Sequence, residues 1–199
     1  MPSPIGHGII GLAVYAGLAN QENRKTFLTK KEITIGLLCS YAPDLDFLPG
    51  LITGKHFQFH HGPTHSLIFG MVFGFTLSFL LGRFRPETFW KGAGIYAFLV
   101  WMHVILDGFI VDNRPLVAHG IKIFYPFSDI TFKSPIDIFF LDLGLKGSID
   151  PRFIFTRENL VPLFQEIIVA IILGALLYGS IVYIREWFNF KKKKIYHNT

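Results

Sequence analysis

The longest apolar stretch of this 199-residue chain spans residues 160–187, and it restricts the possible folds more than any other feature. Glu166 is the only charged residue in the stretch before Arg185. A helix of about 20 mainly apolar residues is long enough to cross the hydrocarbon layer of a membrane. The stretch therefore predicts a transmembrane helix.

Four shorter apolar segments precede it, at residues 5–19, 33–42, 66–81 and 92–111, with a loop region at 49–63 and a long polar and aromatic region at 112–159. Apolar residues make up 51% of the chain and charged residues 17%, and the mean hydropathy is +0.42. Soluble domains usually carry about 25% charged residues. We therefore expect an all-α integral membrane helical bundle, a single domain over 1–199 with about four to five membrane-associated helices. The alternative is a soluble helical domain with a large core.

The basic residues predict the orientation of the chain in a cell membrane. Of 19 lysines and arginines, 12 lie in the segments 20–32 and 82–91 and in the tail from Arg185, which includes the run Lys191 to Lys194. The positive-inside rule makes these three regions cytoplasmic and the chain multi-pass. The net charge of +5 is thus explained by contact with anionic membrane lipid, and we expect no nucleic-acid partner.

Histidines and aspartates lie at the edges of the apolar segments. Three histidines, His60, His61 and His65, fall within six positions just before the segment at 66–81. Under the predicted orientation, the segment edges that carry His7, Asp44, His65, His103 and Asp107 all face the extracytoplasmic side. Because neutral imidazole and carboxylate are the usual ligands of zinc, we predict a metal site there. The expected ligands are His7, Asp44, His60, His65, His103 and Asp107.

Individual members of this set also have simpler explanations. His103 and Asp107 share one face of a helix at the spacing i, i+4, which suits either a common ion or a hydrogen bond within the helix. Asp44 and Asp46 are the candidate catalytic residues, since one carboxylate could bind metal while the other orients a ligand or accepts a proton. The alternative for both is a solvated turn or a helix cap.

Four further residues are open candidates. Glu166 is either a buried carboxylate or a residue of the membrane interface. His61, His119 and Asp142 either join the site or lie apart from it. The single cysteine, Cys39, excludes an intramolecular disulfide and makes a cysteine-based zinc site unexpected.

Several short motifs, taken together, resemble a known family. They are Gly6-His7, Pro43-Asp44-Leu45-Asp46, His60-x-Gly62-x-Thr64-His65-Ser66, His103-x-x-x-Asp107, and Tyr125-Pro126-Phe127-Ser128 followed by Asp142. In this order they resemble the YdjM-like inner-membrane metal-dependent hydrolases. The chain departs from the family pattern at His61, where many relatives carry arginine, and at His119, where tyrosine is frequent.

That family is in turn similar to zinc-dependent phospholipase C and the related single-strand nucleases. The resemblance implies that His7, His65, His103 and Asp107 are metal ligands, that Asp44 is a ligand or general base, and that the substrate is a phosphoester. Because no His-x-x-x-Glu pair follows Asp107, we expect one or two divalent ions, with zinc as the expected metal, rather than three.

The expected function is therefore metal-assisted hydrolysis of a phosphoester or lipid-like substrate at the extracytoplasmic face, with membrane lipid as the surrounding partner. A non-enzymatic membrane metal-binding or transport protein with the same ligands is the alternative. A polar path that continues past Glu166 would favour transport. A lipid-binding structural protein is a third possibility.

Overall fold

The computed structural model describes residues 3–19, 28–54, 59–109, 120–135 and 157–196, and they are helical apart from the connecting segments. The helices, in order, are α1 (Pro4–Ala19), α2 (Lys30–Tyr41), the short 3-10 helix η1 (Pro43–Asp46), α3 (Phe47–Thr53), the 3-10 helix η2 (Pro63–His65), α4 (Leu67–Leu80), α5 (Pro86–Asp107) and α6 (Arg157–Tyr196). Within the described ranges, the only β-type pairing is an isolated bridge between Ile121 and Phe132.

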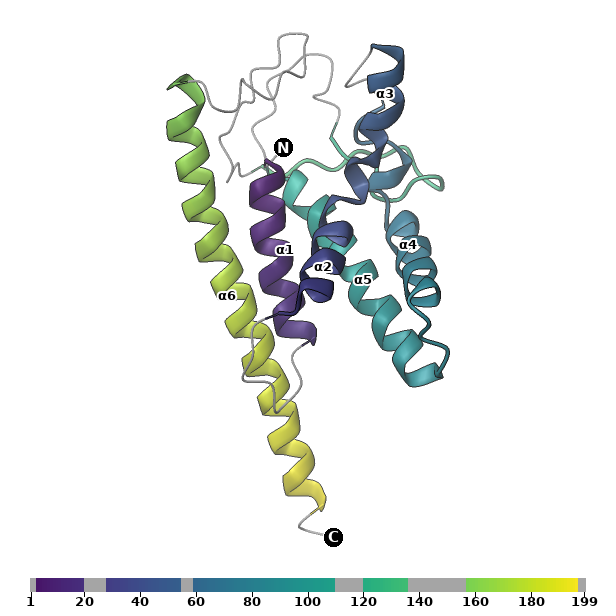
Figure 1. Ribbon diagram of the computed structural model, residues 1–199, viewed down its shortest axis with the longest axis vertical. Coiled ribbons are helices and arrows are strands. Elements are labelled where there is room, and N and C mark those ends of the chain that lie inside the picture. The colour runs from purple at the N-terminus through teal and green to yellow at the C-terminus, as the bar shows by residue number, and fades with distance from the viewer. Residues whose placement is uncertain (1–2, 20–27, 55–58, 110–119, 136–156, 197–199) are drawn as a thin grey trace.

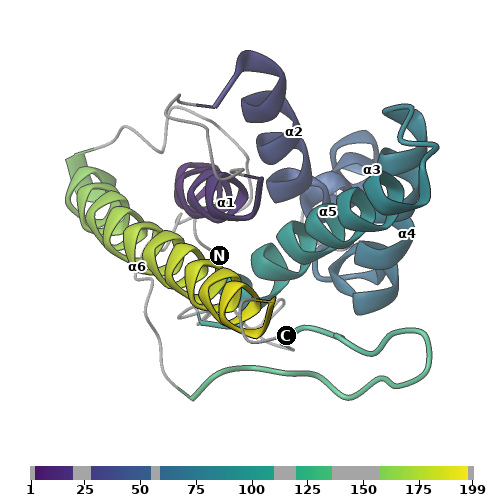
Figure 2. The same cartoon turned by 90° about the horizontal axis from the view of Figure 1, so that it is seen from below.

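The helices form a bundle in which α1 and α5 are central. α6 packs along α1, α1 also contacts α2 and α5, and α4 packs against the outer side of α5. Figure 1 shows α6 as the longest helix, extending past the bundle toward the C-terminus, and Figure 2 shows α1 between α6 and α2. The N-terminus of α1 and the C-terminus of α5 lie at the same end of the bundle (Figure 1).

Small residues allow α4 and α5 to pack closely. Gly70, Gly74 and Ser78 are the buried residues of α4 and repeat every four positions, so they lie on one face. A Cβ atom at Gly74 would lie 2.5 Å from the carbonyl oxygen of Ala93 and 2.8 Å from the backbone nitrogen of Ala97. This is the small-residue contact typical of helix pairs in membranes.

Contacts between α1 and α6, which run parallel to each other, fix the register of these two helices. The backbone N–H and the hydroxyl of Ser3 donate to the Glu166 carboxylate, at 2.6 and 2.7 Å. Near the other end of α1, the Arg185 guanidinium donates to the carbonyl oxygen of Gly17 at 3.2 Å. Glu166 is buried, which agrees with the first of its two predicted environments, that of a buried carboxylate.

The observed helices confirm the predicted all-α membrane bundle and change its boundaries. α5 and α6 are long and apolar enough to cross a membrane, and α2 together with Pro43–Thr53 would be a third such span, bent by 52°. α1 and α4 are shorter apolar helices. The predicted basic loop at 82–91 is wrong in its second half, because α5 already begins at Pro86, where proline suits a first helical turn.

Candidate metal centre

The helix ends at one end of the bundle bring the predicted ligands together. His7 lies in the first turns of α1, and His103 and Asp107 lie in the last turns of α5. Asp44 and Asp46 lie in η1, which follows α2, and His65 lies in η2. The predicted convergence of these segment edges on one site is therefore observed.

A proline turn and a helix cap hold the loop residues in place. Pro43 begins η1 directly after α2, so the two aspartates lie on a tight turn at the helix end. The Ser66 hydroxyl accepts the backbone N–H of Phe69 at 3.1 Å and caps α4. Ser66 also donates to the carbonyl oxygen of Pro63 at 2.7 Å. His65 is therefore held between η2 and the capped end of α4.

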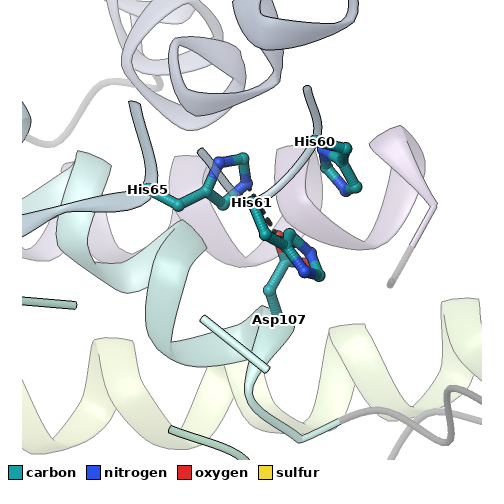
Figure 3. A group of neighbouring side chains, drawn as sticks. All are labelled: His60, His61, His65 and Asp107. Carbon is teal, nitrogen blue, oxygen red and sulfur yellow. Dashed lines mark ion pairs between the residues drawn. The ribbon is translucent and has the colours of Figure 1, made fainter. Parts of the chain in front are cut away.

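Asp107 is the centre of the cluster. Its carboxylate lies 3.1 Å from Nε2 of His7, 3.1 Å from Nε2 of His103 and 3.2 Å from Nε2 of His65. Nε2 of His61 lies slightly farther away, at 3.8 Å. Figure 3 shows His61 and His65 directed toward Asp107, with His60 beside them. Four imidazoles thus surround one buried carboxylate.

The backbone fixes which nitrogen of His103 carries the proton. Nδ1 of His103 lies 2.6 Å from the carbonyl oxygen of Ser40. A carbonyl oxygen only accepts hydrogen bonds, so Nδ1 must donate. In the neutral ring the lone pair then lies on Nε2, which faces Asp107 at 3.1 Å and Asp44 at 3.4 Å.

Asp46 fixes the position of the proton on two other rings, those of His60 and His65. Its carboxylate lies 3.1 Å from Nδ1 of His60 and 3.0 Å from Nδ1 of His65. It also accepts the Thr64 hydroxyl at 3.1 Å and the backbone N–H of Gly62 at 3.4 Å. Both imidazoles therefore donate from Nδ1 and turn a free Nε2 lone pair away from Asp46. Carboxylates that orient metal-binding histidines act in this way.

Four Nε2 atoms of the cluster have no hydrogen-bond partner among the described residues. Nε2 of His60, His61, His65 and His103 is buried without a hydrogen-bond partner among the described residues, as are Oδ1 of Asp44 and Oδ2 of Asp107. Where Nδ1 carries the proton, Nε2 and the carboxylate oxygen are both acceptors, and they repel each other unless a cation lies between them. This donor set fits a metal ion.

Three overlapping groups of residues place their ligand atoms within 4.8 Å of one another. They are His60, His61, His65 and Asp107; Asp44, His65, His103 and Asp107; and Asp44, Asp46 and His60. Asp107 belongs to two of these groups and has two carboxylate oxygens, so it is suited to link two neighbouring ions. His65 belongs to the same two groups but has only its Nε2 lone pair to offer, because Nδ1 donates to Asp46. His7 is in none of the three, although it contacts Asp107 and its ring stacks on His103 with 3.8 Å between centroids.

The loop histidines have perturbed proton affinities. Burial lowers the pKa of His60, and burial together with the neighbouring His60 holds the pKa of His61 well below its ordinary value. Burial also lowers the pKa of His65, but the neighbouring carboxylates of Asp107 and Asp46 outweigh it, so the net pKa is raised. His60 and His61 are therefore neutral at pH 7, with lone pairs available to a cation, whereas His65 holds a proton more readily.

Similarity to a known family extends over almost the whole chain. The chain matches the YdjM inner membrane protein family over residues 1–188. It belongs to that family. No curated protein and no solved structure shows significant similarity to the chain. Among the described residues, this YdjM family member has a buried His/Asp cluster that could hold a metal ion, formed at the ends of helices within the first 107 residues.

The structure also separates the open candidates. His61 lies in the cluster, although its backbone has a positive φ of 62°, a left-handed conformation that costs a non-glycine residue roughly 1–2 kcal/mol. Glu166 binds Ser3 instead and is in none of the groups that could hold an ion. His119 and Asp142 lie outside the described residues. The Ser40 carbonyl was missed, because no sequence signal marks a backbone acceptor.

Proposed function

We propose that this YdjM family member is a membrane-bound, metal-dependent hydrolase that acts on a phosphoester or lipid-like substrate. The carrying observation is the set of unpartnered Nε2 atoms around Asp107, of which those of His65 and His103 are directed there by a carboxylate and a backbone carbonyl behind the ring. Histidine and carboxylate ligands suit zinc, and the overlap of two groups at the Asp107 carboxylate favours two ions over one. A divalent ion bound there would supply an acidified water and would polarise the ester oxygen.

The chain's own residues then divide the work. His65, His103 and Asp107 bind the metal, with His7, His60 and His61 beside them. Asp46 is the orienting carboxylate, because its oxygens are already engaged by His60, His65 and Thr64.

Asp44 is the better candidate for the base. Its Oδ1 has no hydrogen-bond partner within the described part of the chain, and its side chain is 16% exposed, against 0% for Asp107. It can therefore meet a water molecule at the accessible edge of the cluster and accept its proton.

The same topology supports an extracytoplasmic location for the centre in a multi-pass chain. Lys30 and Lys31 begin α2, and the turn with Arg83 and Arg85 joins α4 to α5, at the opposite end of the bundle from the cluster. Lys191 to Lys194 lie near the end of α6, which points the same way (Figure 1). By the positive-inside rule, that end is cytoplasmic.

Metal analysis of detergent-purified protein, combined with hydrolysis assays, tests the proposal. We expect one or two zinc-like ions per chain, and fewer in Asp107→Asn. The matched control is Asp129→Asn, because the Asp129 side chain is 82% exposed and pairs only with Lys122 among the described residues. A wild-type protein that retains no divalent metal after purification and zinc addition would refute the metal centre.

The assay also separates a base from a ligand at Asp44. With bis-p-nitrophenyl phosphate and a phospholipid as substrates, Asp44→Asn should keep the metal and lose about 10²–10⁴-fold in rate if Asp44 is the base. Loss of metal together with activity makes Asp44 a ligand. A metal-loaded wild type that hydrolyses neither phosphoesters nor acyl esters would leave a metal-binding membrane protein as the better description.

A further inference from the structure

Three helices that end at the cluster are too short to cross a membrane. α1, α2 and α4 contain 16, 12 and 14 residues. At 1.5 Å per residue they span about 24, 18 and 21 Å, against about 30 Å for the hydrocarbon layer. If their far ends lie at the basic boundary of the membrane, their cluster ends lie about 6–12 Å below the opposite boundary.

α5 gives an independent measure of this depth. Its last basic residue, Lys91, is 16 residues before Asp107. This corresponds to about 24 Å of helix. Lys91 therefore places Asp107 about 6 Å short of the far side of a 30 Å layer. The two spacings agree that the cluster lies below the membrane surface.

The position of α6 beside α1 also indicates that the cluster lies below the membrane surface. Glu166 contacts Ser3, and Gly174 packs against Ala13 and Ile10. His7 lies between these two contacts, which places it level with about residue 170 of α6. The apolar stretch of α6 begins ten residues earlier, about 15 Å farther along the helix axis. Apolar side chains of α6 thus continue well above the cluster.

α3 lies between the cluster and the membrane boundary opposite the basic one. It has no charged residue, and Leu48, Leu51 and Ile52 are exposed, Ile52 at 86%. Figure 1 shows α3 at the same height as the first turns of α6. In water, such a helix would leave large apolar side chains solvated, whereas in a lipid leaflet this exposure is favourable.

The segment 120–135 adds exposed apolar side chains next to α4, besides its exposed Lys122–Asp129 ion pair. Phe124, Phe127 and Ile130 are exposed, Phe127 at 85%. The segment is joined to α4, because the backbone N–H of Leu67 donates to the carbonyl oxygen of Ile123 at 3.0 Å. α4 continues this surface with exposed Met71, Val72 and Phe75.

We propose that the His/Asp cluster lies within the hydrocarbon layer, about 6–15 Å below its surface, and that α3 and the apolar side chains of 121–132 are embedded in the surrounding lipid leaflet. The occupant of this surface is the acyl region of membrane lipid. For the hydrolase proposed above, on which this last step rests, the substrate is then an amphiphile that enters from the leaflet and brings its ester below the headgroups.

Site-directed spin labelling in lipid nanodiscs tests the placement without requiring metal or activity. Single cysteines replace Ile52 and Phe127 in a Cys39→Ala background, with Leu48→Cys as a second position on α3 if Ile52→Cys does not fold. Ile168 on α6, which is exposed and apolar, provides the lipid reference. Glu87, exposed at the basic end of α5, provides the water reference. Oxygen and the polar relaxation agent NiEDDA are compared at each label.

We expect the labels at residues 52 and 127 to behave like the one at 168, with high oxygen and low NiEDDA accessibility. NiEDDA accessibility like that at residue 87 would overturn the proposal and would show that this surface faces water or a soluble partner. A failure here leaves the metal analysis untouched. Conversely, a protein without metal that shows the lipid pattern would refute the proposed hydrolase while the membrane placement stands.

Discussion

Replacement of Asp46 by asparagine should separate the orientation of ligands from catalysis. The substitution keeps the size of the side chain but leaves one acceptor oxygen where two oxygens accept from His60 and His65. The new NH₂ group would face an imidazole N–H, donor against donor. One of the two rings must then rotate or move its proton to Nε2, which is the atom needed for the metal.

The magnitude follows from the number of rings affected. Loss of a single orienting partner typically weakens metal affinity by about 10–100-fold. Because Asp46 holds two rings, we expect a loss near the upper end, about 100-fold, which corresponds to about 2.7 kcal/mol. Thr64→Val removes only one donor to the same carboxylate and should weaken binding much less.

Competition with a chromophoric zinc chelator in detergent measures the affinity directly. Asp129→Asn is the matched control, since it makes the same chemical change at an exposed carboxylate. Thermal unfolding of each metal-free variant checks that the bundle still forms. An Asp46→Asn protein that binds zinc as tightly as wild type but has lost its activity would contradict the orienting role and would make Asp46 the base.

Three further predictions use other parts of the structure. Gly74→Ala should lower the unfolding temperature, since its Cβ would lie 2.5 Å from the carbonyl oxygen of Ala93, at a cost of about 1–3 kcal/mol, whereas Gly94→Ala, with no atom within 4 Å, should not. Metal occupancy should fall as pH decreases, because a proton on His65, whose pKa is raised, excludes the metal; equal zinc content at pH 5 and pH 8 would contradict this. A reporter fused after Lys194 should be active only in the cytoplasm, and activity only outside would reverse the orientation.

Periodicity and charge predicted most of the fold because both act locally. Long apolar runs such as that of α6 specify a membrane helix without any knowledge of the neighbouring helices. The short α3 was not predicted as a helix, because seven residues containing Pro49 and Gly50 resemble a loop. Its helical form depends on the turn at η1 and on the left-handed Gly54 that ends it, which are three-dimensional features.

The residues of the candidate site could be predicted from the sequence, but the different roles of its aspartates could not. Alternation of the chain between two membrane faces is enough to bring His7, Asp44, His65 and Asp107 to one end, whatever the details of packing. What distinguishes Asp107 from Asp46 is their depth and their partners: one carboxylate faces Nε2 atoms, and the other faces Nδ1 atoms.

The two aspartates have the same side chain, and both lie at a helix end. Their difference arises only when η1 and η2 pack together and turn the rings of His60 and His65 between them. The shortness of α1, α2 and α4 can be understood in the same three-dimensional terms. Each of these helices has one end at the cluster, and with the cluster below the membrane surface, as proposed above, their lengths reflect the depth of the centre rather than the thickness of the membrane.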